Sequence, residues 1–565
     1  MPSTDLYDKH LATFERARQA CRERHCWSPF PEMPNKVPDA PAAQARALAA
    51  FRDQLGRPFV LEQPGTVGHP GEGMGEEVSP YTQEPLGITY PRADVDALFA
   101  GAERAMPRWA AAGTRERIGV LMEVVDRLFR DEIFAVQQAM MHTAGMSPNM
   151  AYAGAGVNAL DRAIEALVHA EMALAAVPSE ARWERRFGEA QIVLAKRYRA
   201  QPRGVAVCFT CATFATWNAW PSMMASLATG NAVIVKPHPG SVLPMALSVR
   251  VFRAVLAEAG FDPDLVTLAL DSVAEPLGKV LVKHPKTAMV DFTGSARFGA
   301  WVEQHAHPAL AFTETAGCNT VVLESADDLD AALRALATTM CMFSAQMCTS
   351  PQNVYVPRGG VATAQGRVPF DEVGARLAAA IAAVGAEPKK AAMILATIQA
   401  PSTLALVGQM RDEGARHGRV LLEPGAYAHP EFPRARTSTP LLVQTTPAAG
   451  ALYREERFGP IGFVVECADA DDALAQATQD VKRHGGLTAF LYSRDEAFIG
   501  RAVDAYSAAG AQLTINLTGP MPLNFAAAYS DYHVTGLNPA GNASLTDLAF
   551  VAGRFRITQS RRPVA

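Results

Sequence analysis

Cys348 is the one cysteine of eight in this 565-residue chain that a loop places at the entrance to a strand. It lies in SAQMCTSPQN, after a predicted helix and directly before the buried run NVYVP. A thiolate in such a place can attack an electrophilic carbon, although a lone cysteine is more often a small buried hydrophobic residue. No histidine occurs in a recognisable partner motif, so a papain-like cysteine–histidine pair is disfavoured.

Two strand-to-helix turns have features of a nucleotide site. In VDFTGSARFG, a buried strand ends at Phe292 and a helix starts near Ser295, so the backbone N–H groups around Gly294 face outward with the positive end of the helix dipole. In AVIVKPHPG, Lys236 emerges at the carboxyl end of another strand. An ordinary turn fits the first spacing equally well, and a lone lysine is more often a solvated loop charge.

Other familiar signatures are missing from the sequence. There is no HExxH, GxxxxGK[ST] or GxSxG motif, and no His/Cys cluster at metal-ligand spacing, so no metal site is predicted. AGAGVNAL, with Gly154 and Gly156, is nearest to a dinucleotide fingerprint. A helical pattern precedes it where a strand is required, which favours helix packing instead.

The surrounding elements predict an α/β fold. From Gly204 onward, short apolar strands alternate with helices in two successive series, which is typical of doubly wound parallel sheets. Two such series predict two sheets with a cleft between them. The charge-free run 204–235 contains Pro221 and Gly230-Asn231, so it reads as strand, loop, short helix and strand rather than as a membrane helix. Residues 190–202 and 550–560 alternate like exposed antiparallel strands that need a pairing partner.

Composition limits the partners. The chain has 52 Lys+Arg and 57 Asp+Glu for a net charge of -5, and these charges are dispersed. This balance excludes a strong electrostatic footprint for nucleic acid or an anionic membrane and favours small molecules. The cysteines are too sparse for a disulfide framework, and the N-terminus lacks the pattern of a signal peptide, so we expect a cytoplasmic protein.

Six motifs in a familiar order give the sequence a resemblance to the aldehyde dehydrogenase superfamily across about residues 85–560. The matches are TWNAWP around Asn218, VKP around Lys236, FTGS at 292–295, ETAGCN from Glu314, AQMC ending at Cys348, and EERFGP around Glu456 and Phe458. The extended N-terminus and the overall length look closest to the branch that acts in phenylacetate degradation.

The resemblance implies a role for each matched residue. Cys348 would attack the aldehyde, Asn218 would stabilise the oxyanion, and Glu314 would activate water against the thioester. The implied cofactor contacts are Lys236 and His238 near the adenosine ribose, Gly294 and Ser295 at the pyrophosphate, and Trp217, Glu456 and Phe458 near the nicotinamide. The family's glutamate three residues after the lysine is Pro239 here, so we expect NADP to be accepted and preferred over NAD.

The family architecture also implies boundaries. We expect an N-terminal extension over 1–85, a cofactor-binding domain over 86–185 and 204–313, and a catalytic domain over 314–515. A bridging arm over 186–203 and 516–565 would make a homodimer or homotetramer. The substrate would be a small aldehyde, such as a semialdehyde of phenylacetate catabolism, with or without CoA attached through a thioester elsewhere in the molecule. A CoA-acylating dehydrogenase and a non-catalytic binding protein of the same fold are the alternatives, and Glu314 argues against both.

Overall fold

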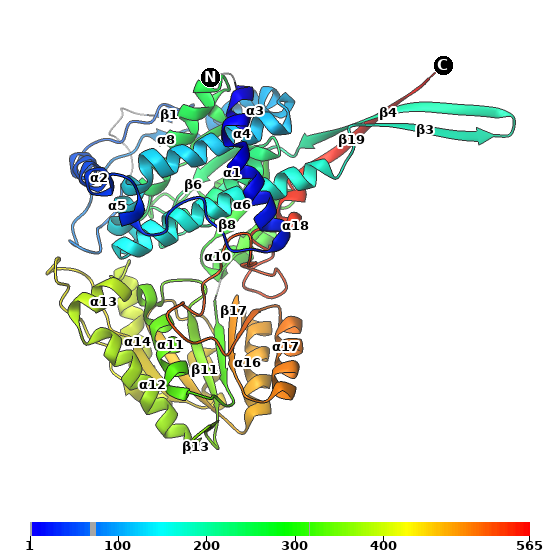
Figure 1. The fold of residues 1–565 in the computed structure, drawn as a ribbon. Coiled ribbons are helices and arrows are strands. Elements are labelled where there is room, and N and C mark those ends of the chain that lie inside the picture. Colours follow the sequence, from blue (N-terminus) through cyan, green and yellow to red (C-terminus); the bar gives the residue numbers. More distant parts are fainter. Residues whose placement is uncertain (1–2, 68–74, 316, 565) are drawn as a thin grey trace.

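A five-stranded parallel sheet forms the centre of the first lobe in this computed structural model, which describes residues 3–67, 75–315 and 317–564 (Figure 1). Its strands follow the order β7-β6-β5-β8-β9. The three central strands are almost wholly buried apolar runs, as expected for a parallel sheet covered on both faces. The strands are β5 (Val205–Phe209), β6 (Ala232–Lys236), β7 (Val266–Leu268), β8 (Thr287–Thr293) and β9 (Leu310–Glu314).

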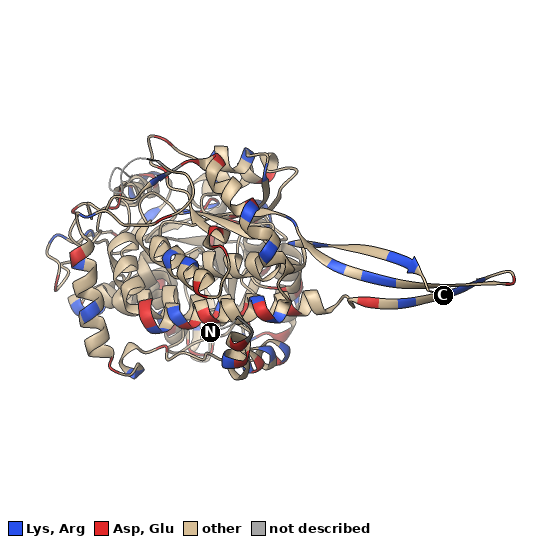
Figure 2. Ribbon diagram, turned by 90° about the horizontal axis from the view of Figure 1, so that it is seen from above, with Lys and Arg blue, Asp and Glu red and all other residues tan. Residues whose placement is uncertain are grey.

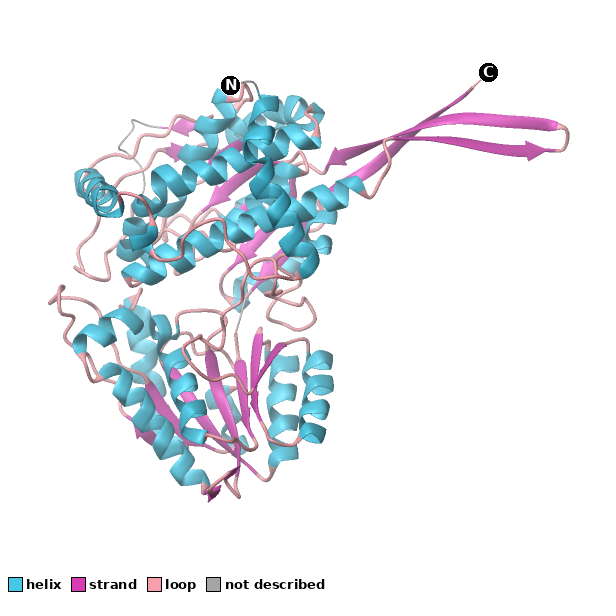
Figure 3. Cartoon of the chain, viewed as in Figure 1, coloured by secondary structure: helices cyan, strands magenta, loops and turns pink. Residues whose placement is uncertain are grey.

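Helices cover both faces of this sheet (Figure 3). They are α3 (Val95–Ala111), α4 (Thr114–Arg127), α5 (Ile133–Ala144), α6 (Asn158–Ala175), α7 (Ala219–Ala228), α8 (Leu243–Glu258), α9 (Gly278–Lys283) and α10 (Ala296–His305). The predicted reading of residues 204–235 is confirmed, because they form β5, a loop, α7 and β6. Gly154 and Gly156 lie in the helical segment Met150–Val157 that leads into α6, which confirms the helix interpretation there.

The N-terminal segment belongs to the same lobe. It contains α1 (Ser3–Glu23), α2 (Ala40–Gln54) and β1 (Thr66–Val67), which pairs with β2 (Arg92–Ala93). Helix α1 lies directly on α4, where a Cβ on Gly119 would come within 2.5 Å of the Tyr7 backbone nitrogen. The side chain of Arg18 also donates to Glu171 of α6 at 2.6 Å. Residues 1–85, predicted as an extension, thus include a helix that shares the core of this lobe.

The second lobe contains a seven-stranded sheet in the order β14-β15-β16-β11-β10-β17-β18, parallel except for edge strand β14. Its strands are β10 (Asn319–Leu323), β11 (Pro351–Pro357), β14 (Arg419–Leu422), β15 (Leu441–Thr445), β16 (Ile461–Cys467), β17 (Thr488–Tyr492) and β18 (Gln512–Ile515). A small hairpin of β12 (Val361–Thr363) and β13 (Gly366–Val368) stands beside it. The predicted second α/β unit is therefore present.

Helices on both faces of this sheet enclose two apolar cores. They are α11 (Leu329–Cys341), α12 (Phe370–Gly385), α13 (Pro388–Ile394), α14 (Pro401–His417), α15 (Gly450–Tyr453), α16 (Ala470–His484) and α17 (Glu496–Ala509). Among the described residues, no helix is both long and apolar enough to cross a membrane.

A three-stranded antiparallel arm projects from the first lobe (Figures 1 and 2). It consists of β3 (Glu180–Phe187), β4 (Ala190–Pro202) and β19 (Phe555–Pro563), with β4 in the middle. The predicted antiparallel strands are confirmed, although the arm starts at Glu180 rather than at 186, and α18 (Leu548–Ala552) precedes β19. Arg554 anchors the base of the arm, since its buried guanidinium lies 2.5 Å from Asp291 of β8.

Residues 516–547 were predicted to lie in the arm. They lie instead against the two lobes, near Cys348. The Asn524 amide donates to the Thr349 hydroxyl at 2.9 Å, and the Asn542 side chain accepts from the Thr313 N–H at 2.8 Å. Buried Arg162 of α6 donates to the Asp531 carbonyl at 2.8 Å. The segment lacks an alternating apolar pattern, so hydrogen bonds of this kind to distant residues fix its position.

Candidate active site

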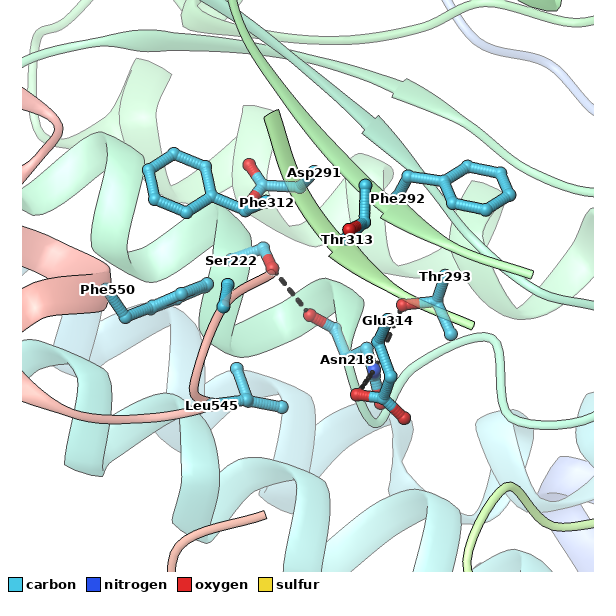
Figure 4. A pocket seen from close by; sticks show the side chains of 11 residues that line it. Asn218, Ser222, Asp291, Phe292, Thr293, Phe312, Thr313, Glu314, Leu545 and Phe550 are labelled. Atoms are coloured by element: carbon cyan, nitrogen blue, oxygen red, sulfur yellow. Dashed lines mark hydrogen bonds between the residues drawn. The ribbon is translucent and has the colours of Figure 1, made fainter. Parts of the chain in front are cut away.

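Asn218, Glu314 and Cys348 come together from three separate segments. Asn218 precedes α7, Glu314 is the last residue of β9, and Cys348 lies in the loop before β11. The Asn218 amide donates to Glu314 Oε2 at 2.6 Å and to the Thr293 hydroxyl at 2.9 Å, as Figure 4 shows. A carboxylate oxygen of Glu314 lies within 4.8 Å of Cys348 Sγ. The three residues that the sequence predicted are therefore neighbours.

The ETAGCN motif holds the Cys348 loop. Buried Asn319 donates to the Cys348 carbonyl and to the Ser350 carbonyl, each at 2.8 Å, and its own oxygen accepts two N–H groups at the start of β17. A Cβ on Gly317 would lie 1.8 Å from the Cys348 carbonyl oxygen, so only glycine fits there. The motif thus fixes the backbone of the cysteine as well as supplying Glu314.

The AQMC motif follows a strained turn. Phe343, Ser344 and Ala345 all have left-handed backbone angles, with φ of 49° to 52°. Such angles are costly for residues other than glycine and cluster at functional sites. Buried Gln346 braces this turn, because its amide donates to the Phe343 carbonyl at 3.1 Å and to the Thr397 carbonyl at 2.8 Å.

The structure adds His533 to the site, which sequence reasoning missed. Its Nε2 lies 3.0 Å from Glu314 Oε1 and 3.7 Å from Cys348 Sγ. A histidine therefore lies beside Cys348 although no partner motif for one is visible in the sequence. No spacing could have revealed it, because 185 residues separate the two side chains along the chain.

Burial and neighbouring charges act on these groups in opposite directions. Burial raises the pKa of Glu314, but its contacts with His533, Cys348 and Asn218 outweigh burial and leave that pKa below the usual value. Burial also raises the pKa of Cys348, and the Glu314 carboxylate raises it further. Glu314 is therefore set to be ionised, whereas the thiol resists ionisation unless a donor stabilises it.

The carboxyl ends of the first sheet have the topology of a dinucleotide site. Strand order reverses between β5 and β8, and such a switch point is where open α/β sheets bind nucleotides. Gly294 and Ser295 form the turn after β8, with the Ser295 hydroxyl capping α10. Beyond β5, the buried Thr210 hydroxyl has no hydrogen-bond partner among the described groups. These features fit a nicotinamide dinucleotide, with the pyrophosphate at the Gly294 turn.

Lys236 and His238, expected near the adenosine ribose, lie at the carboxyl end of β6. Lys236 ends β6, and its Nζ lies 2.6 Å from Asp271 Oδ1, a carboxylate just beyond β7. The sequence analysis did not single out Asp271. His238 is exposed, and its Nδ1 accepts from the Gly240 N–H at 3.1 Å.

Glu456 and Phe458 line a small pocket with Met347, beside the Cys348 loop. Glu456 accepts from the Gly317 N–H at 2.9 Å. Burial raises the pKa of the Glu456 carboxyl to about 7, against the opposing effect of that hydrogen bond. Trp217, expected near the cofactor, packs edge-on against the His533 ring, with 4.4 Å between ring centroids. Trp217 therefore packs on the part of the site that contains His533 and Cys348.

A nucleotide-type lobe, a second α/β lobe and a cysteine that faces a carboxylate are the arrangement of a two-lobed α/β enzyme. The aldehyde dehydrogenase family model matches residues 69–525, and the chain belongs to this family. It is therefore an NAD(P)-dependent oxidoreductase that acts on aldehydes.

Solved structures and curated proteins agree with this assignment. A crystal structure of an NAD-dependent aldehyde dehydrogenase from Burkholderia multivorans is 43% identical, covers 99% of each chain and has a TM-score of 0.94. Vanillin dehydrogenase from Pseudomonas fluorescens is 28% identical over 73% of this chain and 78% of its own length. A Thermus 1-pyrroline-5-carboxylate dehydrogenase with bound NAD has a TM-score of 0.72 over 95% of this chain and all of its own, and its 19% identity shows the fold alone.

Proposed function

We propose that the protein oxidises its aldehyde to the free carboxylic acid through a thioester on Cys348, with Glu314 as the base for hydrolysis. The observation that carries this is the joint position of the nucleophile, the carboxylate and the amide, with Asn218 Nδ2 2.6 Å from Glu314. Hydrolysis of an acyl group from the cysteine needs a base such as this carboxylate close to the thioester, to activate the attacking water.

Each residue has a distinct task. Cys348 Sγ attacks the carbonyl carbon to form a thiohemiacetal, and the Asn218 amide turns from Glu314 to the developing oxyanion. One such donor contributes about 3–4 kcal/mol in comparable sites. Lys236 and the Gly294-Ser295 turn would hold NAD(P), which would supply the hydride acceptor. The Glu314 carboxylate, released from Asn218, then takes a proton from the water that attacks the thioester.

The cofactor preference follows from Asp271 rather than from Pro239. The missing glutamate at 239 led to the expectation of NADP. Asp271 supplies another carboxylate on the ribose side, where it neutralises Lys236 and would repel a 2′-phosphate. We infer that NAD is preferred. The NAD dependence named for the Burkholderia multivorans relative supports this inference.

The substrate is, in this proposal, a semialdehyde of phenylacetate catabolism, as in the branch of the family that acts in phenylacetate degradation. A cavity of about 440 Å³ between the N-terminal segment and the loop after Asn524 supports an apolar or aromatic substrate, because Trp27, Phe30 and Phe525 line it. Asn524 itself contacts Thr349, the neighbour of Cys348. Lys36 and Asp161 add polar groups to the same cavity, which leaves room for a CoA-linked acid group.

Two alternative functions make different demands on the site. A CoA-acylating dehydrogenase usually lacks the base that Glu314 provides, and a binding protein of this fold would not need to keep Cys348, Glu314 and Asn218 together. Their presence favours hydrolysis over both. Product analysis with and without CoA separates the first alternative, since CoA would be consumed only by an acylating enzyme.

We also propose a homodimer or homotetramer in the cytoplasm, assembled through the arm. Cross-strand pairs place Trp183 opposite Leu194 and Phe187 opposite Ala190, and Ile192 shares their face. Phe187 and Ile192 are exposed by 51% and 40%. Arg185, opposite Ile192, and Lys196, over the Trp183 ring, lie on the same face. This partly apolar face, on a projecting sheet with open edges, suits the sheet of a second copy.

An aldehyde panel, each member tested with NAD and NADP, tests the function through the absorbance of the reduced cofactor. Cys348→Ala should abolish hydride transfer. Glu314→Gln should permit a single burst and leave an acyl-enzyme that mass spectrometry detects. Multiple turnovers by Cys348→Ala, or no acyl-enzyme in the glutamine variant, would contradict the proposal.

A further inference from the structure

His533 occupies a position that the family motifs do not assign. Its Nε2 faces two acceptors, Glu314 Oε1 at 3.0 Å and Cys348 Sγ at 3.7 Å. The side chain is only 4% exposed. Because Glu314 is set to be ionised, the proton between them lies on Nε2, which makes this nitrogen the donor. Nδ1 is buried with no hydrogen-bond partner among the described groups.

The surroundings hold His533 rigidly from both sides. Its backbone N–H donates to the Leu545 carbonyl at 3.0 Å, and its ring packs against Trp217. Two residues earlier, the Asp531 carbonyl accepts from Arg162, which is itself buried and paired with Glu165 at 2.7 Å. A side chain fixed by packing and by a second layer of hydrogen bonds is preorganised for a function.

The groups around the Cys348 sulfur disfavour a thiolate there, so a thiolate needs a hydrogen-bond donor to stabilise it. Glu314 at the end of β9, Glu456 before β16 and Cys211 after β5 all disfavour a negative charge on Cys348. The guanidinium carbon of Arg162 lies 5.4 Å from the centroid of the Trp217 ring, and Glu165 pairs with this guanidinium. His533 is the donor that the fold aims at both the carboxylate and the sulfur.

We propose that His533 is a further catalytic residue: as the Cys348 thiol attacks, its proton passes to the neighbouring Glu314 carboxylate, and the Nε2–H of His533 donates to the sulfur that is left negative. The same N–H holds Glu314 in the resting site and is shared with the sulfur as negative charge builds up there. Hydrogen bonds to ionised groups are about twice as strong as those between neutral groups, and a dry site strengthens them. The inference rests on the proposed function only in taking Cys348 as the nucleophile.

The test is the pH profile of Cys348 alkylation by iodoacetamide in the full chain, followed by mass spectrometry of the peptide. His533→Phe keeps a ring but removes the donor, and we expect alkylation at pH 7 to slow at least tenfold with the inflection displaced to higher pH. His533→Gln restores a donor that does not titrate and should recover the rate to within about threefold. His169→Gln, at a buried histidine outside the site, is the matched control and should follow the unaltered protein.

Each outcome decides the proposal. Identical profiles for the unaltered protein and His533→Phe overturn it, and so does a glutamine variant as slow as the phenylalanine variant. If the phenylalanine variant does not fold, His533→Leu serves as the second donor-free variant, judged by the same criteria. Loss of activity in Cys348→Ala tests the proposed function separately, so failure of one conclusion is distinguishable from failure of the other.

Discussion

The carboxylate of Asp271 lies 2.6 Å from the ammonium nitrogen of Lys236, just beyond two neighbouring strands of the cofactor lobe. Both side chains are largely buried, and burial lowers the pKa of Lys236 while Asp271 opposes that shift. In this pair the Asp271 carboxylate already neutralises the positive charge of Lys236, at the place where we propose that the ribose binds. A second negative charge from a 2′-phosphate would therefore be unfavourable there.

Asp271→Asn should shift the cofactor preference toward NADP. Removing the carboxylate frees the Lys236 charge for a 2′-phosphate, so we expect kcat/KM for NADP to rise about tenfold or more while that for NAD falls. Initial rates with both cofactors at a saturating aldehyde measure the ratio. Asp262→Asn, which changes a carboxylate at the start of a short helix before β7, is the control. An unchanged ratio in Asp271→Asn would refute the assignment.

The affinity for the cofactor should depend on pH through Glu456. Because burial raises its pKa to about 7, this carboxyl is mostly neutral at pH 6 and mostly ionised at pH 8. If the ionised form accepts hydrogen bonds from the nicotinamide ribose, KM for NAD should rise as the pH falls through 7. Glu456→Gln should flatten this dependence, whereas exposed Glu455→Gln should keep it. A pH-dependent KM that persists in Glu456→Gln would argue against this role.

Charges on the apolar face of the arm should dissociate the oligomer. Ile192→Glu combined with Leu194→Glu places two carboxylates on the face shared with Trp183, and burying them against a second copy would be costly. We expect monomers by analytical ultracentrifugation at micromolar concentration. Gln191→Glu points to the opposite face and should leave the assembly intact. If the unaltered protein is itself a monomer, the assembly proposal fails.

Arg554→Met should destabilise the first lobe strongly. The guanidinium is fully buried and contacts both oxygens of Asp291, so its removal leaves an uncompensated carboxylate in the core. Breaking a buried pair in this way typically costs about 3–5 kcal/mol. Thermal unfolding followed by circular dichroism measures the effect. Arg556→Met, two residues further along β19, should change the midpoint little, and equal midpoints for both variants would contradict the expectation.

Much of the fold is readable from the sequence because parallel strands buried on both faces must be short apolar runs. Residues 204–235 illustrate this, since their lack of charge together with Pro221 distinguishes β5, α7 and β6 from a membrane helix. The amphipathic helices were also predictable, because their apolar residues recur at helical spacing on the face that packs against the sheet. The segment 516–547 was misplaced because it has neither kind of periodicity, and its position depends on clamps from distant residues such as Arg162.

The candidate site divides in the same way. The sequence by itself was enough to single out Cys348, Glu314 and Asn218, because they occur in motifs that resemble those of the family, and the close approach at Gly317 shows why one of these motifs needs its glycine. Only the tertiary structure decided that His533 reaches that cysteine and that Asp271 faces Lys236. Those contacts join segments whose order along the chain carries no information about distance in space, and packing of the lobes brings them together.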